Sequence, residues 1–164
     1  MASLKYGQLN PSATNTRILP VAASQYFYHN GVNAVYLDSS GNVTLALTAT
    51  ATLYGVAIVP TGMGAGTDPL VWKSSATAGA DKIPVIPISD DDEFIFPSDG
   101  TVVAGDRGNA CDLAAVNDGT ATYVTRATDS TKVFIIQDLA TNRVSNALAT
   151  DIIVKLNIAK QQAD

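Results

Sequence analysis

Histidine and cysteine, which often supply general-base and nucleophilic chemistry, occur once each in this chain, as His29 and Cys111. A Ser-His-Asp or Cys-His arrangement would have to be built around this one imidazole. The sequence also has no G-x-S-x-G segment to present a serine nucleophile at a strand-to-helix turn. We therefore expect His29 to be a turn or interface residue, Cys111 to be a small buried hydrophobe, and the protein not to be an enzyme.

Two further segments contain residues that could bind a ligand. Four consecutive carboxylates, Asp90, Asp91, Asp92 and Glu93, have oxygen ligands suited to a hard cation. Neighbouring residues of an extended chain point to opposite faces, so the four cannot all converge on one ion, and a solvated acidic turn is favoured while cation binding stays open. The glycine-rich segment TGMGAGTD at residues 61–68 leads into no helix start, which favours a loop over a dinucleotide site. We assign no metal and no cofactor.

Composition excludes several classes of partner. The chain has 164 residues, a formal net charge of -5 and only ten scattered basic residues, which argues against nucleic-acid binding. No run approaches the roughly 18 apolar residues of a membrane span, and a single cysteine allows no intramolecular disulfide. The N-terminus does not resemble a signal peptide, so we expect a protein that is made in the cytoplasm.

The pattern of residues predicts an all-β fold with little helix, either a small β-barrel or a β-sandwich. The segment AVYLDSSGNVTLAL at residues 34–47 predicts two strands joined by a tight turn, with Gly41 supplying a positive φ. Pro84, Pro87 and Pro97 favour edge strands or extended connections. The segments KVFIIQDL and TDIIVKLNIAK are apolar and rich in β-branched residues, as buried strands are.

The chain is expected to divide into two regions that differ in composition and periodicity. Residues 1–20 contain Gly7, Pro11 and Pro20 among polar residues and show no sustained period, which predicts an extended N-terminal arm outside the folded body. Residues 21–164 are expected to form a single compact β-domain that ends in a frayed polar tail, KQQAD.

Two parts of this domain have similar sequence patterns. Residues 33–37 (NAVYL) align with residues 109–113 (NACDL) at an offset of 76, and each segment is followed by a glycine-containing turn and a Thr-rich strand. The apolar runs at residues 56–59 and 133–136 align at an offset of 77. Residues 32–59 and 108–136 are therefore a possible pseudo-repeat, that is, two similar β-units from an internal duplication. The alternative is that any all-β chain shows a similar order of strands and turns.

Aromatic residues are the main candidates for contact. Most of them are expected to fill the core, but the run Tyr26, Phe27 and Tyr28 must direct at least one ring away from it, because consecutive strand residues point both ways.

The segment VNAVYLDSSGNVTLALTATATLYGVAI, echoed in RGNACDLAAVNDGTATYVT, resembles the head decoration (capsid cement) proteins of tailed bacteriophages. The resemblance covers residues 32–58 well and the second half loosely. It implies a virion structural protein that binds the exterior of an assembled capsid, contacts the major capsid protein, and bridges its subunits. It also implies a homo-oligomer, with a trimer favoured, and an N-terminal arm that reaches the shell by strand addition.

The residues expected at the interface are Leu4, Tyr6, Leu9, Arg17, Ile18, Tyr26, Tyr28 and Trp72. A second interpretation is a phage tail, fibre or cell-surface β-module that binds carbohydrate or a host receptor, with Tyr26, Tyr28 or Trp72 as a stacking platform.

Overall fold

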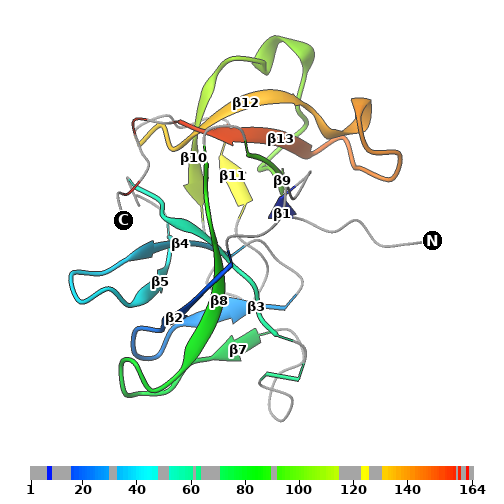
Figure 1. Ribbon diagram of the computed structural model, residues 1–164. Helices are drawn as coiled ribbons and strands as arrows, with labels where there is room; N and C mark the ends of the chain where they lie inside the picture. The colour runs from blue at the N-terminus through cyan, green and yellow to red at the C-terminus, as the bar shows by residue number, and fades with distance from the viewer. Residues whose placement is uncertain are drawn as a thin grey trace.

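The computed structural model describes residues 7–8, 16–29, 33–47, 52–60, 62–63, 71–89, 92–114, 123–125, 131–157, 159 and 162. Within this part of the chain the secondary structure consists of β-strands and two short 3-10 turns, which confirms the all-β prediction. The strands form two curled antiparallel sheets, one above the other in Figure 1, and a separate two-stranded ribbon.

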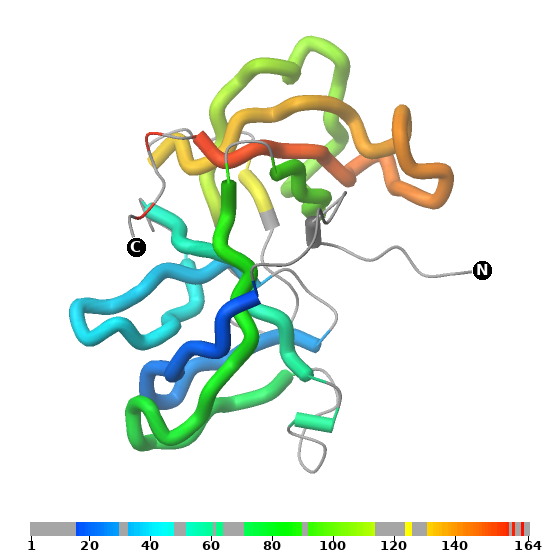
Figure 2. Tube along the Cα trace, viewed as in Figure 1, coloured from blue at the N-terminus to red at the C-terminus, as the bar shows by residue number. Residues whose placement is uncertain are grey.

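The first sheet uses strands from the first half of the chain. Its spatial order is β2-β8-β6-β4-β5, with bounds β2 Arg17–Pro20, β4 Asn33–Leu37, β5 Val43–Leu45, β6 Gly55–Ala57 and β8 Lys82–Pro87. The ribbon pairs β3 (Tyr26–Tyr28) with β7 (Val71–Lys73). Figure 2 shows this half as the lower part of the tube, which runs from blue through cyan to green.

The second sheet uses the second half of the chain plus one short N-terminal strand. Its order is β1-β9-β13-β12-β10-β11, with bounds β1 Gly7–Gln8, β9 Glu93–Pro97, β10 Ala110–Ala114, β11 Tyr123–Thr125, β12 Phe134–Leu139 and β13 Asp151–Leu156. The 3-10 turns are η1 (Ala104–Asp106), between β9 and β10, and η2 (Ala140–Asn142), between β12 and β13.

Each sheet curls back until the strand at one end meets a residue near the other end. In the first sheet Val21, which follows β2, forms a parallel bridge with Val43 of β5, and in the second sheet Ser98, which follows β9, forms one with Val124 of β11. The same backbone bonds recur at both closures: Ala22 N donates to Val43 O at 3.0 Å, and Asp99 N donates to Val124 O at 3.1 Å. We call the two closed units the first barrel and the second barrel.

The closures show which positions of the two barrels are equivalent. Val43 pairs with Leu37, and Val124 pairs with Leu113, so the first strand of each hairpin is equivalent at the predicted offset of 76 residues. Val56 pairs with Ala34, whereas Ile135 pairs with Ala110, so the third strands are equivalent at an offset of 79 rather than 77. Two β-units with equivalent hairpins and closures are therefore present, and the offset of their third strands is two residues larger than the sequence alignment predicted.

The hairpin that carries the repeat is fixed by one carboxylate. Asp38 Oδ1 accepts hydrogen bonds from the backbone N–H of Ser40 (2.8 Å) and of Asn42 (2.9 Å). Gly41 has a φ of +76°, a conformation that glycine adopts without strain. Burial opposes ionisation of Asp38, but the hydrogen bonds from Asn42 and Ser40 hold its pKa below the usual value. The turn therefore forms where the sequence predicted it.

Hydrophobic side chains join the two barrels. One cluster fills the first barrel and includes Val35, Ile83 and Val85. A second cluster fills the second barrel, and Leu53, Val56 and Ile88 of the first half also belong to it. The C-terminal segment adds polar contacts, because the Gln162 side chain pairs with the backbone N–H and C=O of Leu37, both at 2.8 Å. Gln162 is therefore anchored on the first barrel, contrary to the expected frayed tail.

The predicted boundary of the N-terminal arm is also corrected. Residues 17–20 are β2, which pairs with β8 along its whole length, and Leu19 packs against the first hydrophobic cluster. Gly7 and Gln8 pair with Ile95 and Phe94. Residues 17–20 therefore belong to the folded body, because they supply one wall of the first barrel.

Two of the prolines occupy an interior strand, contrary to the expected edge position. Pro84 and Pro87 lie in β8, between β2 and β6. Pro84 faces β6 one residue beyond the end of that strand, where its carbonyl accepts a hydrogen bond from Ile58 N at 2.9 Å. Pro87 faces the β2 side, where Arg17–Val85 is the last pair among the described residues. Each missing N–H therefore falls outside the described ladder pairs, a position at which a sheet tolerates proline.

Gly55 is required by close approach of β6 to β8. A Cβ built there would lie 2.5 Å from the backbone oxygen of Ile86 and 2.7 Å from Val85 Cγ1. We expect Gly55→Ala to lower the free energy of unfolding by about 3 kcal/mol, a typical cost of overpacking. Chemical denaturation measures this effect. Gly105→Ala is the control, since a Cβ at Gly105 meets nothing within 4 Å, and an equal loss in both variants would contradict the explanation.

Two truncations test the corrected arm boundary. Deleting residues 2–15 removes β1 but keeps β2, so the first barrel should fold, whereas deleting residues 2–20 also removes a wall strand and should disrupt that barrel. Trp72 is the chain's one tryptophan and lies in the first barrel's hydrophobic cluster, so its fluorescence reports on that barrel. Native-like emission after deletion of residues 2–20 would return the boundary to residue 20.

Candidate interaction surface

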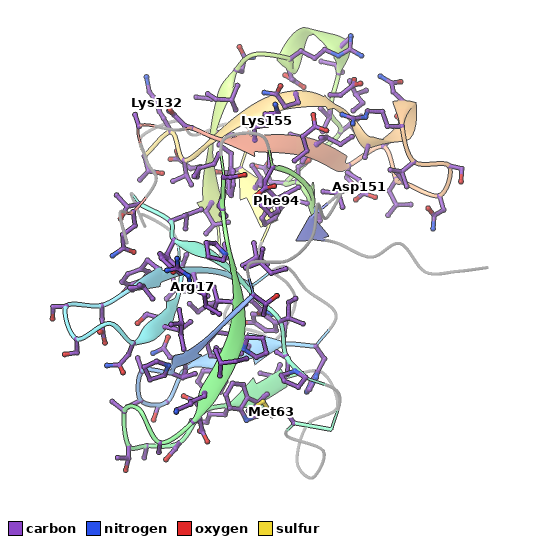
Figure 3. The ribbon with its side chains drawn as sticks, in the orientation of Figure 1. Arg17, Met63, Phe94, Lys132, Asp151 and Lys155 are labelled. Carbon is purple, nitrogen blue, oxygen red and sulfur yellow. The ribbon has the colours of Figure 1, made fainter. Side chains whose placement is uncertain are left out.

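The predicted interface residues separate into exposed and buried groups. Arg17, Ile18 and Tyr26 lie on the surface, whereas Tyr28 and Trp72 are buried. Leu4, Tyr6 and Leu9 lie outside the described residues. Figure 3 labels Arg17 on β2, and its Nη1 donates a 2.8 Å hydrogen bond to Tyr54 Oη.

Trp72 and Tyr28 belong to the core of the first half. The Trp72 ring stacks on Phe27, with centroids 5.5 Å apart and an interplanar angle of 25°. Tyr28 is held by Asn33, whose Oδ1 accepts from Tyr28 N at 2.7 Å and whose Nδ2 donates to Tyr28 O at 2.9 Å. Tyr26 is the ring that leaves the core side, as predicted, and Lys73 Nζ lies 5.1 Å from its centroid.

Cys111 and Asp92 are buried in the fold. Cys111 is buried, and burial, with smaller contributions from Asp112 and Asp99, raises the pKa of its thiol to about 12. The thiol therefore stays protonated at physiological pH, and it behaves as the small hydrophobe that was expected. Asp92 is buried and its Oδ2 accepts from Ser89 N at 2.9 Å, whereas Asp90 and Asp91 lie outside the described residues.

Neither a metal cluster nor a spanning helix is found in the described part of the chain. No three His, Cys, Asp or Glu residues there are grouped so that they could hold a metal ion. Among the same residues, no helix is long and apolar enough to cross a membrane.

An apolar row is exposed on the outer face of the first barrel. Ile18 of β2 pairs with Pro84 of β8, and Pro84 accepts the hydrogen bond from Ile58 N at the end of β6. Residues directly opposite one another on neighbouring strands share a face, so the three side chains form a line across the sheet. Ile18 is 60% exposed and Ile58 is 47% exposed. We call Ile18, Pro84 and Ile58 the uncovered row.

The equivalent row of the second barrel is buried. Ile18 precedes the closing residue Val21 by three positions, and Ile95 precedes the closing residue Ser98 by three. Ile95 pairs with Ile153 of β13, and these side chains are 2% and 0% exposed. Ala140, Val144 and Ala147 pack against them. Residues 140–147, which begin with η2, therefore act as a covering segment for the second barrel.

Two carboxylates fasten the covering segment. Asp138 Oδ1 accepts from Asn142 Nδ2 at 2.9 Å and also from Arg107 Nη2 at 2.6 Å. Glu93 accepts two bonds from Arg143, at 3.0 and 2.7 Å, in the bidentate geometry that favours such pairs. The hydrogen bond from Asn142 is the main influence that lowers the pKa of Asp138, and the hydrogen bond from Arg143 is the main influence that lowers the pKa of Glu93.

The first barrel lacks these carboxylates at the matching positions. Asp138 pairs with Ile153, as Ile58 meets Pro84, so Ile58 occupies the position of Asp138. Thr16 occupies the position of Glu93, since each lies two residues before its isoleucine. The first barrel therefore presents the apolar row without the groups that would hold a cover from its own chain.

The strand edges differ in the same way. β1 pairs with β9 at Ile95 and Phe94, beside the point where β11 closes the barrel. In the described part of the chain, β2 is instead the edge strand of its sheet. Val21 N bonds toward β8 and Ala22 N bonds away from it, so by alternation the Ile18 N–H points away from β8, toward the open side. Among the described residues, the first barrel thus has neither of the two covers found on the second barrel.

The sequence indicated Ile18 but gave no signal for Pro84 or Ile58. Their alignment depends on the registers of β2 with β8 and of β8 with β6, which join segments more than twenty residues apart. Hydrophobicity alone places Ile58 in the apolar run 56–59 and predicts that it is buried. Val56 and Ala57 of this run are buried, whereas Ile58 is exposed.

No protein-family model matches the chain, and no curated protein matches it significantly.

Acid should release the covering segment. The pKa values of Glu93 and Asp138 are lowered in the folded state, so the stability that they give the covering segment is complete above the ordinary carboxylate pKa of about 4 and is lost as the pH falls through the lowered values. We expect amide hydrogen exchange in residues 140–147, corrected for intrinsic rates, to speed up between pH 5 and pH 3. The double variant Glu93→Gln, Asp138→Asn should exchange fast at both pH values. Equal protection of the native protein at pH 5 and pH 3 would contradict this role.

Proposed function

We propose that the protein is a non-enzymatic virion structural protein that binds the outer surface of an assembled bacteriophage capsid and stabilises it by bridging major capsid subunits. It acts there as a homo-oligomer, with a trimer favoured. The proposal starts from the resemblance of residues 32–58 to head decoration proteins and is consistent with the two-barrel, all-β body. Its location on the capsid exterior follows from the same resemblance.

One observation carries the proposal: in the part of the chain that the structure describes, one of two equivalent barrels has an exposed apolar row and a strand edge with no partner strand. The second barrel buries the same positions under β1 and the covering segment. Natural proteins usually protect edge strands and bury rows of large apolar side chains, so sites left open are candidates for protein contact. A structural protein binds its neighbours in an assembly through such surfaces.

The open edge suggests how the shell is contacted. Pro20 has no N–H, and Ala22 N is used at the barrel closure, so within β2 the Ile18 N–H is the donor directed to the open side. An extended segment of a capsid subunit can pair there, as β1 pairs with β9 at Ile95. A short pairing of this kind is weak singly, but repetition around a closed lattice raises the total attachment through avidity.

The alternative of a carbohydrate-binding or receptor-binding module has less support. Trp72 and Tyr28, two of its three proposed platform residues, are buried in the first half's core. Tyr26 remains exposed, with Lys73 near its ring. A glycan platform would therefore have to rest on Tyr26.

Binding to undecorated phage heads tests the function. We expect saturable, stoichiometric binding of the native protein, and Ile18→Pro should weaken it by about tenfold because one main-chain donor is lost. Ile18→Leu is the matched control and should bind normally, since it keeps the N–H and the apolar side chain. The amount of protein that co-sediments with the heads provides the measurement.

The two parts of the proposal fail differently. Absence of saturable binding by the native protein would overturn the capsid function. Normal binding by Ile18→Pro would retain that function and overturn attachment at the β2 edge.

A further inference from the structure

We propose that the uncovered row of the first barrel binds the η1 turn of a second copy of this chain, so that copies associate head to tail. This inference takes up the oligomeric part of the proposed function and names its two surfaces. It concerns the outer face of the sheet, whereas the capsid contact proposed above concerns the strand edge. Both positions are occupied at the same time around Ile95, which shows that they do not exclude one another.

The second barrel provides the precedent for this contact. There the covering segment begins with a three-residue 3-10 turn, η2, and places the small side chains Ala140, Val144 and Ala147 on Ile95 and Ile153. The row equivalent to these isoleucines is the uncovered row. A turn of the same kind that carries small apolar side chains is therefore the cover that its shape accommodates.

The η1 turn has these properties and is exposed. It is also a three-residue 3-10 turn, Ala104–Asp106, and none of its residues is buried. Val103, which precedes it, is 54% exposed, and its N–H donates to Asp106 Oδ2 at 2.8 Å, which fixes the turn. Val102 N donates to Ala149 O at 3.1 Å, so Leu148, which is 61% exposed, lies next to the same loop. Two exposed apolar side chains thus flank one prominent turn.

The charges of the two halves are complementary. Residues 1–89, which include the uncovered row, carry four basic and three acidic side chains, for a net charge of +1. Residues 90–164, which include η1, carry six basic and twelve acidic side chains, for a net charge of -6. Lys82 is exposed on β8, on the same face as Pro84. Asp106 lies in η1, next to Arg107, which forms an ion pair with Asp138. If the uncovered rows of two copies met, their Lys82 side chains would come together. Contact of the η1 turn of one copy with the uncovered row of another instead brings Asp106 toward Lys82.

The proposed contact joins different surfaces of the two copies. Such a heterologous interface leaves one row and one turn free at the ends of any open chain of copies, until a ring closes. A variant that loses the row still has its turn, and a variant that loses the turn still has its row. This property gives the interface a signature that a symmetric contact does not have.

Sedimentation velocity with the full chain tests the proposal without a capsid. We expect the native protein to have a mass that is a multiple of 17.0 kDa. Ile58→Glu, in the row, and Val103→Glu, beside the turn, should each be monomeric, because each places a carboxylate in an apolar contact. An equimolar mixture of the two should form a dimer, since one intact row can meet one intact turn, and should not grow beyond it.

Control variants keep the result interpretable. Leu47→Glu changes an exposed leucine outside both surfaces and should keep the native mass. Leu148→Glu is a second variant on the turn side and should behave as Val103→Glu does. Ile58, Val103, Leu47 and Leu148 are all exposed, so circular dichroism should show native folding in each case.

Three outcomes would overturn the inference: a monomeric native protein at tens of micromolar, native assembly by either Ile58→Glu or Val103→Glu, or a mixture that stays monomeric. A monomeric native protein that nevertheless binds phage heads would retain the capsid function and reject this interface. A head-to-tail oligomer that binds no heads would do the reverse.

Discussion

The closure of each sheet on itself is the constraint on which the rest of the structure depends. A single backbone hydrogen bond, from Ala22 to Val43 in one barrel and from Asp99 to Val124 in the other, joins the strand that starts the unit to the second strand of its hairpin. Because side chains alternate along each strand, this closure decides which residues face inward. The inward set fills the barrels, and the outward set must be covered or left in water. Gly55 and the positions of Pro84 and Pro87 are consequences of the same curled geometry.

The outward isoleucines are buried in the second barrel and exposed in the first, and polar groups explain the difference. A covering segment with small side chains gains little from burial alone. Bonds from Asn142 to Asp138 and from Arg143 to Glu93 fix its conformation and offset the entropy lost when it is ordered. With Ile58 and Thr16 at the matching positions, the first barrel has the apolar surface but no such fastening. Its row is suited to a partner that arrives already folded.

The features that depended on local sequence were predictable. The D-S-S-G-N turn formed as expected because Asp38 and Gly41 act within five residues, and the 76-residue offset of the hairpins was correct. Prediction was wrong where distant segments decide the outcome. The arm boundary missed β2, because only the partner strand β8 gives residues 17–20 their place, and the offset of the third strands depended on a connection whose length the alignment could not fix. Trp72 and Tyr28 were predicted at an interface, yet stacking on Phe27 and bonding to Asn33 hold them inside.

The paired rows also place different evolutionary demands on similar residues. A substitution at Ile95 or Ile153 changes a buried contact, so selection on those positions acts through the stability of the fold. A substitution at Ile18 or Ile58 leaves the fold almost unaffected, and selection there acts through whatever the surface meets. Homologous chains should therefore keep the second row apolar in every lineage, while the first row drifts together with the residues that contact it.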